Sequence, residues 1–566
     1  MNMKTNITIL VVALLLGACT SNDEERVVAP VSIQLTASVA TETLSPGDAT
    51  AWSREAWKEL TSRRATRGVQ DNSLASGQKA YLWADKGSAG TYTYLKAWAL
   101  TSNGSGGLTG STKYYPSDGD GLTFRAMHGN FSTTPTEGST AIGTFTHSVL
   151  ANQSASGNLE LSDLMYGEGS GSYQTVSSAP LNFTHKLSKI EVKLTAGPGM
   201  GASDMPNVVV KVKNVKPSIT INAADGSLGS ASGTAITVTA RHTGNGIFEA
   251  VIPPQTAPTG VLTLTYSGVT VTVPNTVATF ASNRRYVYNV TVKNVCKEMN
   301  PLYYVAEGNV RSYDSSTKTV ALETNPATAG YAYCFTWAWA MTYFAKQTSS
   351  YNEYWQGVVT DGRSSFRYHL PCLKELYSVL PVRSMNIFDN SSFLPNGGFI
   401  NPAVICIFGY NDETKAGIDD WSYWCPFITN NVRYAIRFLG TKYCSAWKYE
   451  YSTNNHTLTV TAKLIPRLER SDNTLPAQLS AYINNASFWT TFNEDNGEFR
   501  RIFYSVGYRN GSNGIADRDL DYAGYCWSTT ESGDASSFRL GFTEPFTFID
   551  QYYKVYGFSV RLFHDR

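Results

Sequence analysis

The sequence predicts a mainly β protein whose C-terminal part mixes helices and strands. Residues 30–295 contain many short runs of Val, Ile and Thr separated by Gly, Asn and Asp, which is the pattern of β-sandwiches. From Cys296 onward the composition changes, because seven of the eight cysteines, dense aromatic residues and two helix-like segments lie there. A chain of 566 residues is long enough for several domains, and this change sets the main boundary between them.

Residues 1–19 have the features of a bacterial export signal. Lys4 supplies a positive charge, and the apolar run Ile7–Leu16 is too short to anchor the chain across a bilayer. The small residues that lead to Cys19 resemble a lipobox, in which the cysteine is lipidated and becomes the new N-terminus. We therefore expect a lipoprotein signal that ends at Cys19; the alternative is an ordinary signal peptide with a cysteine there by chance.

Charge and motifs argue against several functions. The chain has 46 Lys and Arg against 45 Asp and Glu, so no basic surface indicates nucleic acid as a partner. No second long apolar run follows the signal. The motifs H-E-x-x-H and G-x-S-x-G are absent, and the seven histidines form no pair at metal-ligand spacing. We expect no enzymatic activity and no cofactor.

A strand and a charged loop open the first body. Alternation with period two predicts the strand. The apolar residues that alternate are Val31, Ile33, Leu35, Ala37 and Val39. Residues 52–68 are charged and contain Arg64 and Arg67. We interpret them as a protease-sensitive loop, because exposed segments with small and basic residues are preferred cleavage sites; a solvated connection is the alternative.

Several short sequence motifs follow one another in a fixed order further along the first body. They are Tyr114-Tyr115-Pro116 before Gly121-Leu122-Thr123-Phe124, Ser162-Asp163-Leu164-Met165, Leu181–Ile190, Ile252-Pro253-Pro254-Gln255 and Asn283–Val290. With the lipobox, they resemble the fimbrillin family of Bacteroides-type bacteria. The resemblance implies two tandem transthyretin-like β-sandwiches, which we place at residues 20–178 and 179–295.

The resemblance also implies a way of assembling. Fimbrillins are exported as lipoproteins, and an arginine-specific protease then cuts beyond the first strand. Loss of that strand exposes unpaired backbone groups, which a strand from a neighbouring subunit satisfies. Carried over, the removable strand is Val31–Val39 and the cleavage site is Arg67 or, as second choice, Arg64. The segment around Trp57 is longer than the family's usual spacing, so the exact arginine stays open.

Three features of the first body have structural interpretations. His185 lies between Phe183 and Leu187 on an expected strand, which is typical of a packed histidine rather than a ligand or base. Tyr286 and Tyr288 alternate on another strand and should pack. Residues 117–121 are rich in Asp and Gly but lack the spacing of a calcium loop, so we expect a hairpin turn.

Two helices are expected in the second body, residues 296–566. In the first, Tyr331–Gln347, three aromatic residues spaced four apart predict a core-facing stripe. They are Phe335, Trp339 and Tyr343. The second helix follows His369-Leu370-Pro371, with proline in the first turn. Its expected inward residues are Leu373, Leu376 and Leu380.

These helices, the strand-like segment Tyr525–Glu531 and the closing segment Tyr556–Arg561 resemble the Fibrobacter-type major paralogous domain. That domain shares its broad fold with C-type lectins and formylglycine-generating enzymes, so the resemblance implies a C-type-lectin-like adhesin domain. The family's closing cysteine is absent, since Leu562 and Phe563 stand there. The lectin motifs Glu-Pro-Asn and Trp-Asn-Asp are absent too.

Ligand candidates in the second body are weak. The tryptophans that could offer stacking faces for sugars are Trp424, Trp447 and Trp527, although packing explains them better. The carboxylates that could converge on a cation are Asp517, Asp519 and Asp521, although a solvated loop explains them better. We therefore assign no metal. The cysteines lack a zinc spacing and leave disulfide pairing open.

The sequence thus favours a fimbrial tip subunit and adhesin at the cell surface. A stalk subunit must donate a C-terminal strand, whereas here residues 558–563 look integral to a globular domain. Expected partners are other pilin subunits, a host or bacterial surface glycan or protein, and, before processing, the outer membrane through the lipid. The second hypothesis is an outer-membrane lipoprotein that binds glycans and never polymerises. The third, a formylglycine-generating type of enzyme, lacks its reactive cysteine pair.

Overall fold

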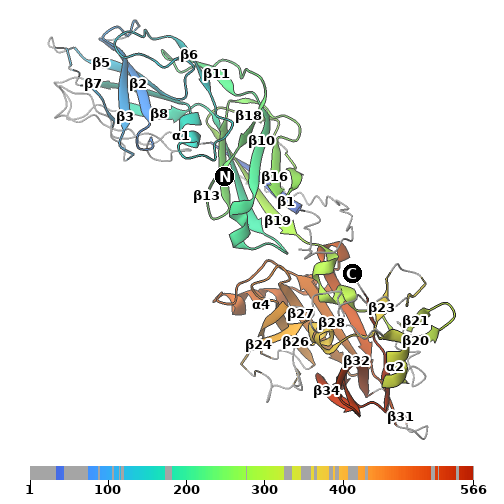
Figure 1. Cartoon of the computed structure of the whole chain (residues 1–566). Coiled ribbons are helices and arrows are strands. Elements are labelled where there is room, and N and C mark those ends of the chain that lie inside the picture. Colours follow the sequence, from blue (N-terminus) through green and yellow to red (C-terminus); the bar gives the residue numbers. More distant parts are fainter. Residues whose placement is uncertain are drawn as a thin grey trace. The chain divides into compact units, whose positions relative to one another are not determined.

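The computed structural model describes most of the chain. The described residues are 33–43, 74–86, 90–104, 108–111, 113, 115–116, 120–171, 181–275, 277–323, 334–345, 359–362, 366–380, 387–388, 394, 396–405, 418–426, 431–510, 517–520, 522–543 and 547–564. They form two compact units (Figure 1). The first unit holds the described parts of Ile33–Ala196 and Ala202–Val292, and the second those of Gly197–Gly201 and Lys293–Arg566.

A six-stranded sheet begins the first unit. Its strand order is β4 (Leu108–Thr109), β3 (Leu95–Ser102), β2 (Lys79–Lys86), β5 (Leu122–His128), β7 (Met165–Gly171) and β8 (Leu181–His185). Strand β2 is buried on both faces. Leu82 packs on one face with Trp98 and Phe124, while on the other the ring of Trp83 lies 5.5 Å from that of Phe145. Phe145 belongs to β6 (Thr144–Ser148), which therefore lies over this sheet.

Two further sheets complete the first unit as a sandwich. One has the order β1 (Ile33–Thr43), β19 (Arg284–Asn294), β9 (Ser188–Ala196), β14 (Ile247–Ile252) and β13 (Arg241–Gly244). The other has the order β12 (Ile236–Thr239), β10 (Val209–Val215), β16 (Leu262–Tyr266) and β17 (Val269–Val273). Small pairs add β15 (Gln255–Thr256) with β18 (Thr279–Phe280), and β11 (Ser218–Asn222) with β6. Among strands β9 to β19 of these described sheets, the pairings are antiparallel except that of β19 with β9, which is parallel.

The arrangement differs from the expected domain boundaries in two places. Strand β8 belongs to the first sheet, so the division falls after His185 rather than at 178/179. Strand β1, expected within the first sandwich, lies beside β19 in a sheet formed otherwise by residues 188–294. Partners this far apart in sequence are set by tertiary packing, which the alternation of a single strand does not reveal.

The residues interpreted as packing do pack. His185 is buried, and its Nδ1 lies 2.8 Å from Oδ2 of Asp163. Tyr286 and Tyr288 are also buried, and the hydroxyl of Tyr288 donates to Asn275. Residues 117–119 of the expected hairpin turn lie outside the described residues.

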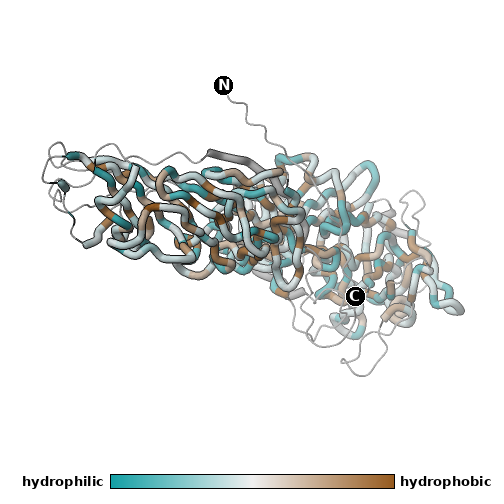
Figure 2. The backbone as a smooth tube through the Cα atoms, turned by 90° about the horizontal axis from the view of Figure 1, so that it is seen from above, coloured by the Kyte–Doolittle hydropathy of each residue, from teal (hydrophilic) through white to brown (hydrophobic). Residues whose placement is uncertain are grey.

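Within its described residues, the second unit contains two large sheets and four α-helices. One sheet runs β24 (Gly398–Ile405), β25 (Ile418–Trp424), β26 (Val432–Arg437), β27 (Ser445–Ser452), β28 (Thr457–Leu464) and β29 (Glu498–Tyr504). The other runs β31 (Asp517–Leu520), β30 (Val506–Arg509), β35 (Gly557–Ser559), β32 (Ala523–Gly533), β33 (Ser536–Thr543) and β34 (Thr547–Tyr553), with β22 (Cys334–Thr336) paired to β35. The helices are α2 (Trp337–Phe344), α3 (Leu373–Val379), α4 (Leu475–Ile483) and α5 (Ala486–Thr490). Figure 2 shows hydrophobic and hydrophilic stretches alternating along the backbone of both units.

Two-stranded pairs complete this unit. They are β20 (Asn309–Asp314) with β21 (Thr319–Glu323), and β23 (Tyr368–His369) with β36 (Phe563–His564). The first unit has one short α-helix, α1 (Asn158–Ser162). Among the described residues, no helix has the length and apolar character needed to cross a bilayer.

The position of α3 and its inward leucines agree with the prediction, whereas the proline expected in its first turn lies outside the helix. Leu376 and Leu380 are buried, and Leu373 packs against the same core. Proline stands just before the helix, because Cys372 is the N-cap and Pro371 precedes it. The side chain of Glu375 accepts a hydrogen bond from the backbone N–H of Cys372, which closes a capping box.

The core stripe expected on the first helix is wrong. The residues of α2 that face the core are Trp337, Ala340 and Phe344. Phe335 belongs to β22, Trp339 is half-buried, and 37% of Tyr343 is exposed. The two stripes have similar helical spacing, so spacing indicates a face but not which face turns inward.

Candidate functional site

Strand β1 lies between two sheet edges of the first unit. It pairs with β19 at the edge of one sheet (Figure 1). It also contacts β17, the edge strand of the opposite sheet. Strand β1 therefore closes one side of the sandwich. We call the slot between β19 and β17 that β1 fills the strand-accepting seam.

Apolar side chains lie below this seam. On β19 the buried residues include Tyr288, Val290 and Val292, and on β17 they are Val271 and Val273. On its other side β19 is already paired with β9, in parallel, from Arg284 to Val292. Without β1, backbone groups of β19 would lose their strand partners, and the apolar core would open along its edge. A β-strand of suitable alternation is the natural replacement.

The processing residues expected from the sequence lie largely outside the described part. Cys19, Val31, Arg64 and Arg67 all fall there. The other four residues of the expected removable strand are on β1. They are Ile33, Leu35, Ala37 and Val39. As alternate residues of a strand, these four share one face.

The tryptophans considered as sugar-stacking faces are core residues. Trp424, Trp447 and Trp527 are all 0% exposed. Trp424 and Trp447 both stack on the ring of Tyr449, at 5.5 and 5.9 Å between centroids. The indole N–H of Trp527 donates to the carbonyl of Phe335 over 3.0 Å. None of the three offers a face to a ligand, so this candidate assignment is corrected.

Only part of the acidic candidate site lies within the described residues. Asp517 and Asp519 lie on strand β31, where Asp517 is opposite Arg509 of β30, and Asp521 lies outside the described residues. Within the described ranges, no group of three His, Cys, Asp or Glu side chains is arranged to hold a metal ion.

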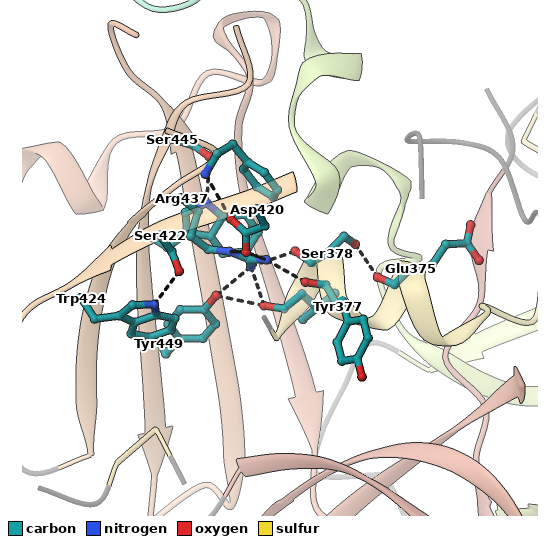
Figure 3. A network of polar contacts seen from close by, with 12 residues as sticks. Glu375, Tyr377, Ser378, Asp420, Ser422, Trp424, Arg437, Ser445 and Tyr449 are labelled. Atoms are coloured by element: carbon teal, nitrogen blue, oxygen red, sulfur yellow. Dashed lines mark hydrogen bonds and ion pairs between the residues drawn. The ribbon is translucent and has the colours of Figure 1, made fainter. Parts of the chain in front are cut away.

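The buried arginine Arg437 joins helix α3 to the sheet (Figure 3). Its Nε and Nη2 donate to Oδ2 of Asp420 over 3.0 and 2.8 Å. Its Nη1 donates to the carbonyls of Ser378 and Val379 and to the hydroxyl of Tyr449, and Nη2 also donates to the carbonyl of Tyr377. This one guanidinium thus caps the C-terminal carbonyls of α3.

Charge pairing keeps this network stable in a dry environment. Burial by itself lowers the pKa of Arg437, but the carboxylate of Asp420 raises it above its ordinary value, so the charge is retained. Burial raises the pKa of Tyr449, which keeps its hydroxyl neutral. That hydroxyl donates to the carbonyl of Val379 over 2.9 Å. No side chain of the network is exposed enough to act on a substrate, so we interpret it as structural.

The segment 557–564 is built into the second unit. Strand β35 pairs with β22, β30 and β32. Arg561 is fully buried, and strand β36 pairs with β23. The ring of His564 stacks on Phe366, with centroids 3.9 Å apart and planes 8° from parallel. This segment could leave only by opening the core.

The six cysteines within the described ranges are all buried. They are Cys296, Cys334, Cys372, Cys425, Cys444 and Cys526. Burial raises the pKa of Cys444 and of Cys526 to about 12, which keeps both thiols protonated and unreactive.

One group of accessible aromatic residues was not assigned a function from the sequence. Phe335, Trp339, Tyr343 and Tyr313 form a row in which neighbouring ring centroids lie 4.0, 5.0 and 4.9 Å apart. Elements β22, α2 and β20 supply these four residues, which we call the aromatic ladder. The sequence did contain a sign that Trp339 and Tyr343 face outward. Residues 337, 340 and 344 form a second apolar stripe on the same helix, and that stripe is the one buried in the structure.

Two family models match the chain, and they meet close to the boundary between the two structural units. Residues 64–307 match a family described as fimbrillin-like. Residues 297–563 match a family described as a domain of unknown function, DUF8237. Residues 64–307 therefore resemble fimbrillin-like proteins, and residues 297–563 resemble a separate family.

Two solved structures are similar to part of the chain. A candidate cell adhesion protein from Bacteroides uniformis is 21% identical, over 41% of this chain and 92% of its own, with a TM-score of 0.31. A fimbrial protein from Bacteroides vulgatus is 12% identical, over 44% of this chain and 95% of its own, with a TM-score of 0.24. These low scores give the likenesses no weight in the functional argument. Among curated proteins, none is significantly similar in sequence.

Proposed function

We propose that the protein is a fimbrial tip subunit and adhesin that assembles by strand addition. The fimbrillin-like match supports a fimbrial role, and the position of β1 at two sheet edges supports exchange of that strand. In this proposal, removal of β1 opens the strand-accepting seam, and a strand of a neighbouring pilin subunit fills it.

A tip position, rather than a stalk position, is supported by one observation. Segment 557–564 forms part of the core of the second unit, so it cannot serve as a strand donated to the next subunit. A subunit that accepts a strand but offers none from this segment belongs at the end of a fibre. The second unit then stands as the adhesive head, with a host or bacterial surface glycan or protein as its ligand. Its C-type-lectin-like character remains a prediction.

Processing follows from the sequence motifs. The chain is exported, lipidated at Cys19 and held on the outer membrane by that lipid. An arginine-specific protease then cuts after Arg67 or Arg64, releases the anchor with β1, and lets the subunit join a fibre.

The decisive experiment combines N-terminal sequencing with localisation on purified surface fibres. We expect a new N-terminus directly after Arg67 or Arg64, and immunogold label against the second unit at fibre ends only. Replacing Arg64 and Arg67 by lysine should keep the lipidated chain uncut, while Arg63→Lys, in the same loop, serves as the matched control. Label along the whole fibre would contradict the tip position. An uncut, lipidated monomer in the parent strain would instead support a surface lipoprotein that binds glycans without polymerising.

A further inference from the structure

The aromatic ladder is a surface feature that packing alone does not explain. Its rings belong to three different elements and form a continuous row, but its members pack only partly against the core below. Helix α2 supplies Trp339 and Tyr343, and it buries a different stripe. A solvated helix normally carries charged residues on its outer face. Residues 334–345 contain none.

The polar atoms of the ladder are available. Within the described part of the chain, the indole N–H of Trp339 and the hydroxyls of Tyr313 and Tyr343 take part in no hydrogen bond. Tyrosine and tryptophan combine a flat apolar body with a polar end. The ladder therefore combines partly exposed rings with polar ends, and Phe335 covers one face of the indole of Trp339. Partly exposed rings with polar ends suit a small polar ligand that has apolar faces.

Charge and size narrow the class of ligand. The exposed charged residues of β20 and the turn after it, Arg311, Asp314 and Lys318, carry both signs, so no strong charge of one sign lies on this hairpin. A whole aromatic side chain buries roughly 150–250 Å², and these four are already partly covered. The ladder thus offers less than the roughly 800 Å² per partner of a standard protein interface. A sugar chain needs only a narrow row of rings.

We propose that the aromatic ladder binds neutral glycans, with sugar rings packed on Trp339 and Tyr343 and sugar hydroxyls bonded to the free polar atoms. The inference rests on the proposed adhesive role and names its ligand class. Sugar rings expose C–H groups on their faces and hydroxyls at their edges, which match the ring faces and polar ends of the ladder. No metal ion takes part.

The test uses the soluble chain, residues 20–566, on a printed array of neutral, sialylated and sulfated oligosaccharides. We expect binding to neutral glycans, unchanged by EDTA. Titration calorimetry with the best neutral oligosaccharide should show at least about tenfold weaker binding for Tyr343→Ser and for Trp339→Ala. The matched control is Tyr553→Ala, which removes a tyrosine that is 58% exposed on the same unit but outside the ladder, and it should change binding less than about twofold.

Folding is separated from binding by thermal melts of each variant. Trp339 also lies 5.3 Å from the core ring of Phe344, so its removal loosens the helix, whereas Tyr343 stands at the exposed end. Tyr343→Ser is thus the decisive variant. Binding to acidic glycans only, loss of binding in EDTA, equal binding by Tyr343→Ser, or no glycan binding at all would each overturn the inference.

The outcome is independent of the fibre experiment. If the protein is found at fibre ends but binds no neutral glycan, the ladder inference is wrong and the proposed tip role stands. If it binds neutral glycans through the ladder but never enters fibres, the ladder inference stands and the tip role is wrong.

Discussion

At the scale of single residues, the second unit depends on a charge that water cannot reach. The guanidinium of Arg437 is fully buried and donates hydrogen bonds to Asp420 and to the carbonyls at the end of α3. Burying an ion pair is costly, so it is stable only when both partners and the surrounding hydrogen bonds are present. The pair is therefore sensitive to the replacement of one carboxylate oxygen of Asp420 by an amide nitrogen.

We expect Asp420→Asn to destabilise the second unit by about 3–5 kcal/mol, because Arg437 would stay buried without its countercharge. Asp419→Asn removes an exposed carboxylate from the neighbouring position of β25 and should have almost no effect. Chemical denaturation of the full chain, followed by tryptophan fluorescence, measures both. Equal stability of the two variants would show that the network of Figure 3 is not required.

A buried histidine gives the first unit a pH dependence. Nδ1 of His147 accepts from the backbone N–H of Asn130, and Nε2 lies 3.0 Å from the carbonyl of Ser162, which fixes one neutral tautomer. Burial lowers the pKa of His147 from 6.5 to about 4. A proton on Nδ1 would point at the N–H of Asn130, so the folded state resists protonation.

The first unit should therefore lose stability as the pH falls from 6.5 towards 4. In this window the unfolded state binds the proton and the folded state does not, so each pH unit costs about 1.4 kcal/mol. Hydrogen exchange of peptides from residues 122–196 of the full chain measures this loss. His147→Gln should flatten the dependence, and His456→Gln, in the second unit, should leave it unchanged. A slope that survives His147→Gln would contradict the assignment.

At the scale of elements, loss of strand β1 would leave the strand-accepting seam open to another strand. Strand β1 is held by pairing to β19 and by contact along β17, without any covalent link across the sandwich among the described residues. Its binding energy should come from backbone pairing with β19 and from the contact with β17. A separate peptide with the same alternation can supply both.

A chain beginning at Gly68 should therefore bind a fluorescent peptide of residues 33–43, measured by anisotropy. Serine at positions 33, 35, 37 and 39 should abolish binding, because these alternate residues form the apolar face. Serine at positions 34 and 36 changes the other face and serves as the control. The uncut chain, whose seam is filled, should not bind. Binding by the uncut chain would show that the peptide occupies another surface.

The position and buried face of an element could be predicted where the residues around it supplied a second signal besides the spacing of its apolar residues. For α3, a proline before the helix and three leucines spaced along it predicted both its position and its buried face. For α2, the stripes 335/339/343 and 337/340/344 are equally apolar, and only the packing against β22 and β32 chooses between them. The strand 33–43 was predictable from alternation, but its neighbours β19 and β17 lie more than 200 residues away and were not.

At the scale of the whole molecule, the amino-acid composition was enough to predict the fold class. Short alternating strands before residue 295 and the change at Cys296 predicted a mainly β chain with a distinct C-terminal body, and both are present. The candidate site was less predictable, because residue type does not determine depth. Trp424, Trp447 and Trp527 share their chemistry with Trp339, yet only Trp339 is partly accessible. The packing around each indole, and not its sequence neighbourhood, decides this.

The central position of β35 sets an order of events during folding. Strands β32, β30 and β22 all pair with a segment that is synthesised after them. The second unit thus cannot complete this sheet until residues 557–559 have been made, so a polypeptide that is terminated or clipped just before them leaves the sheet unfinished.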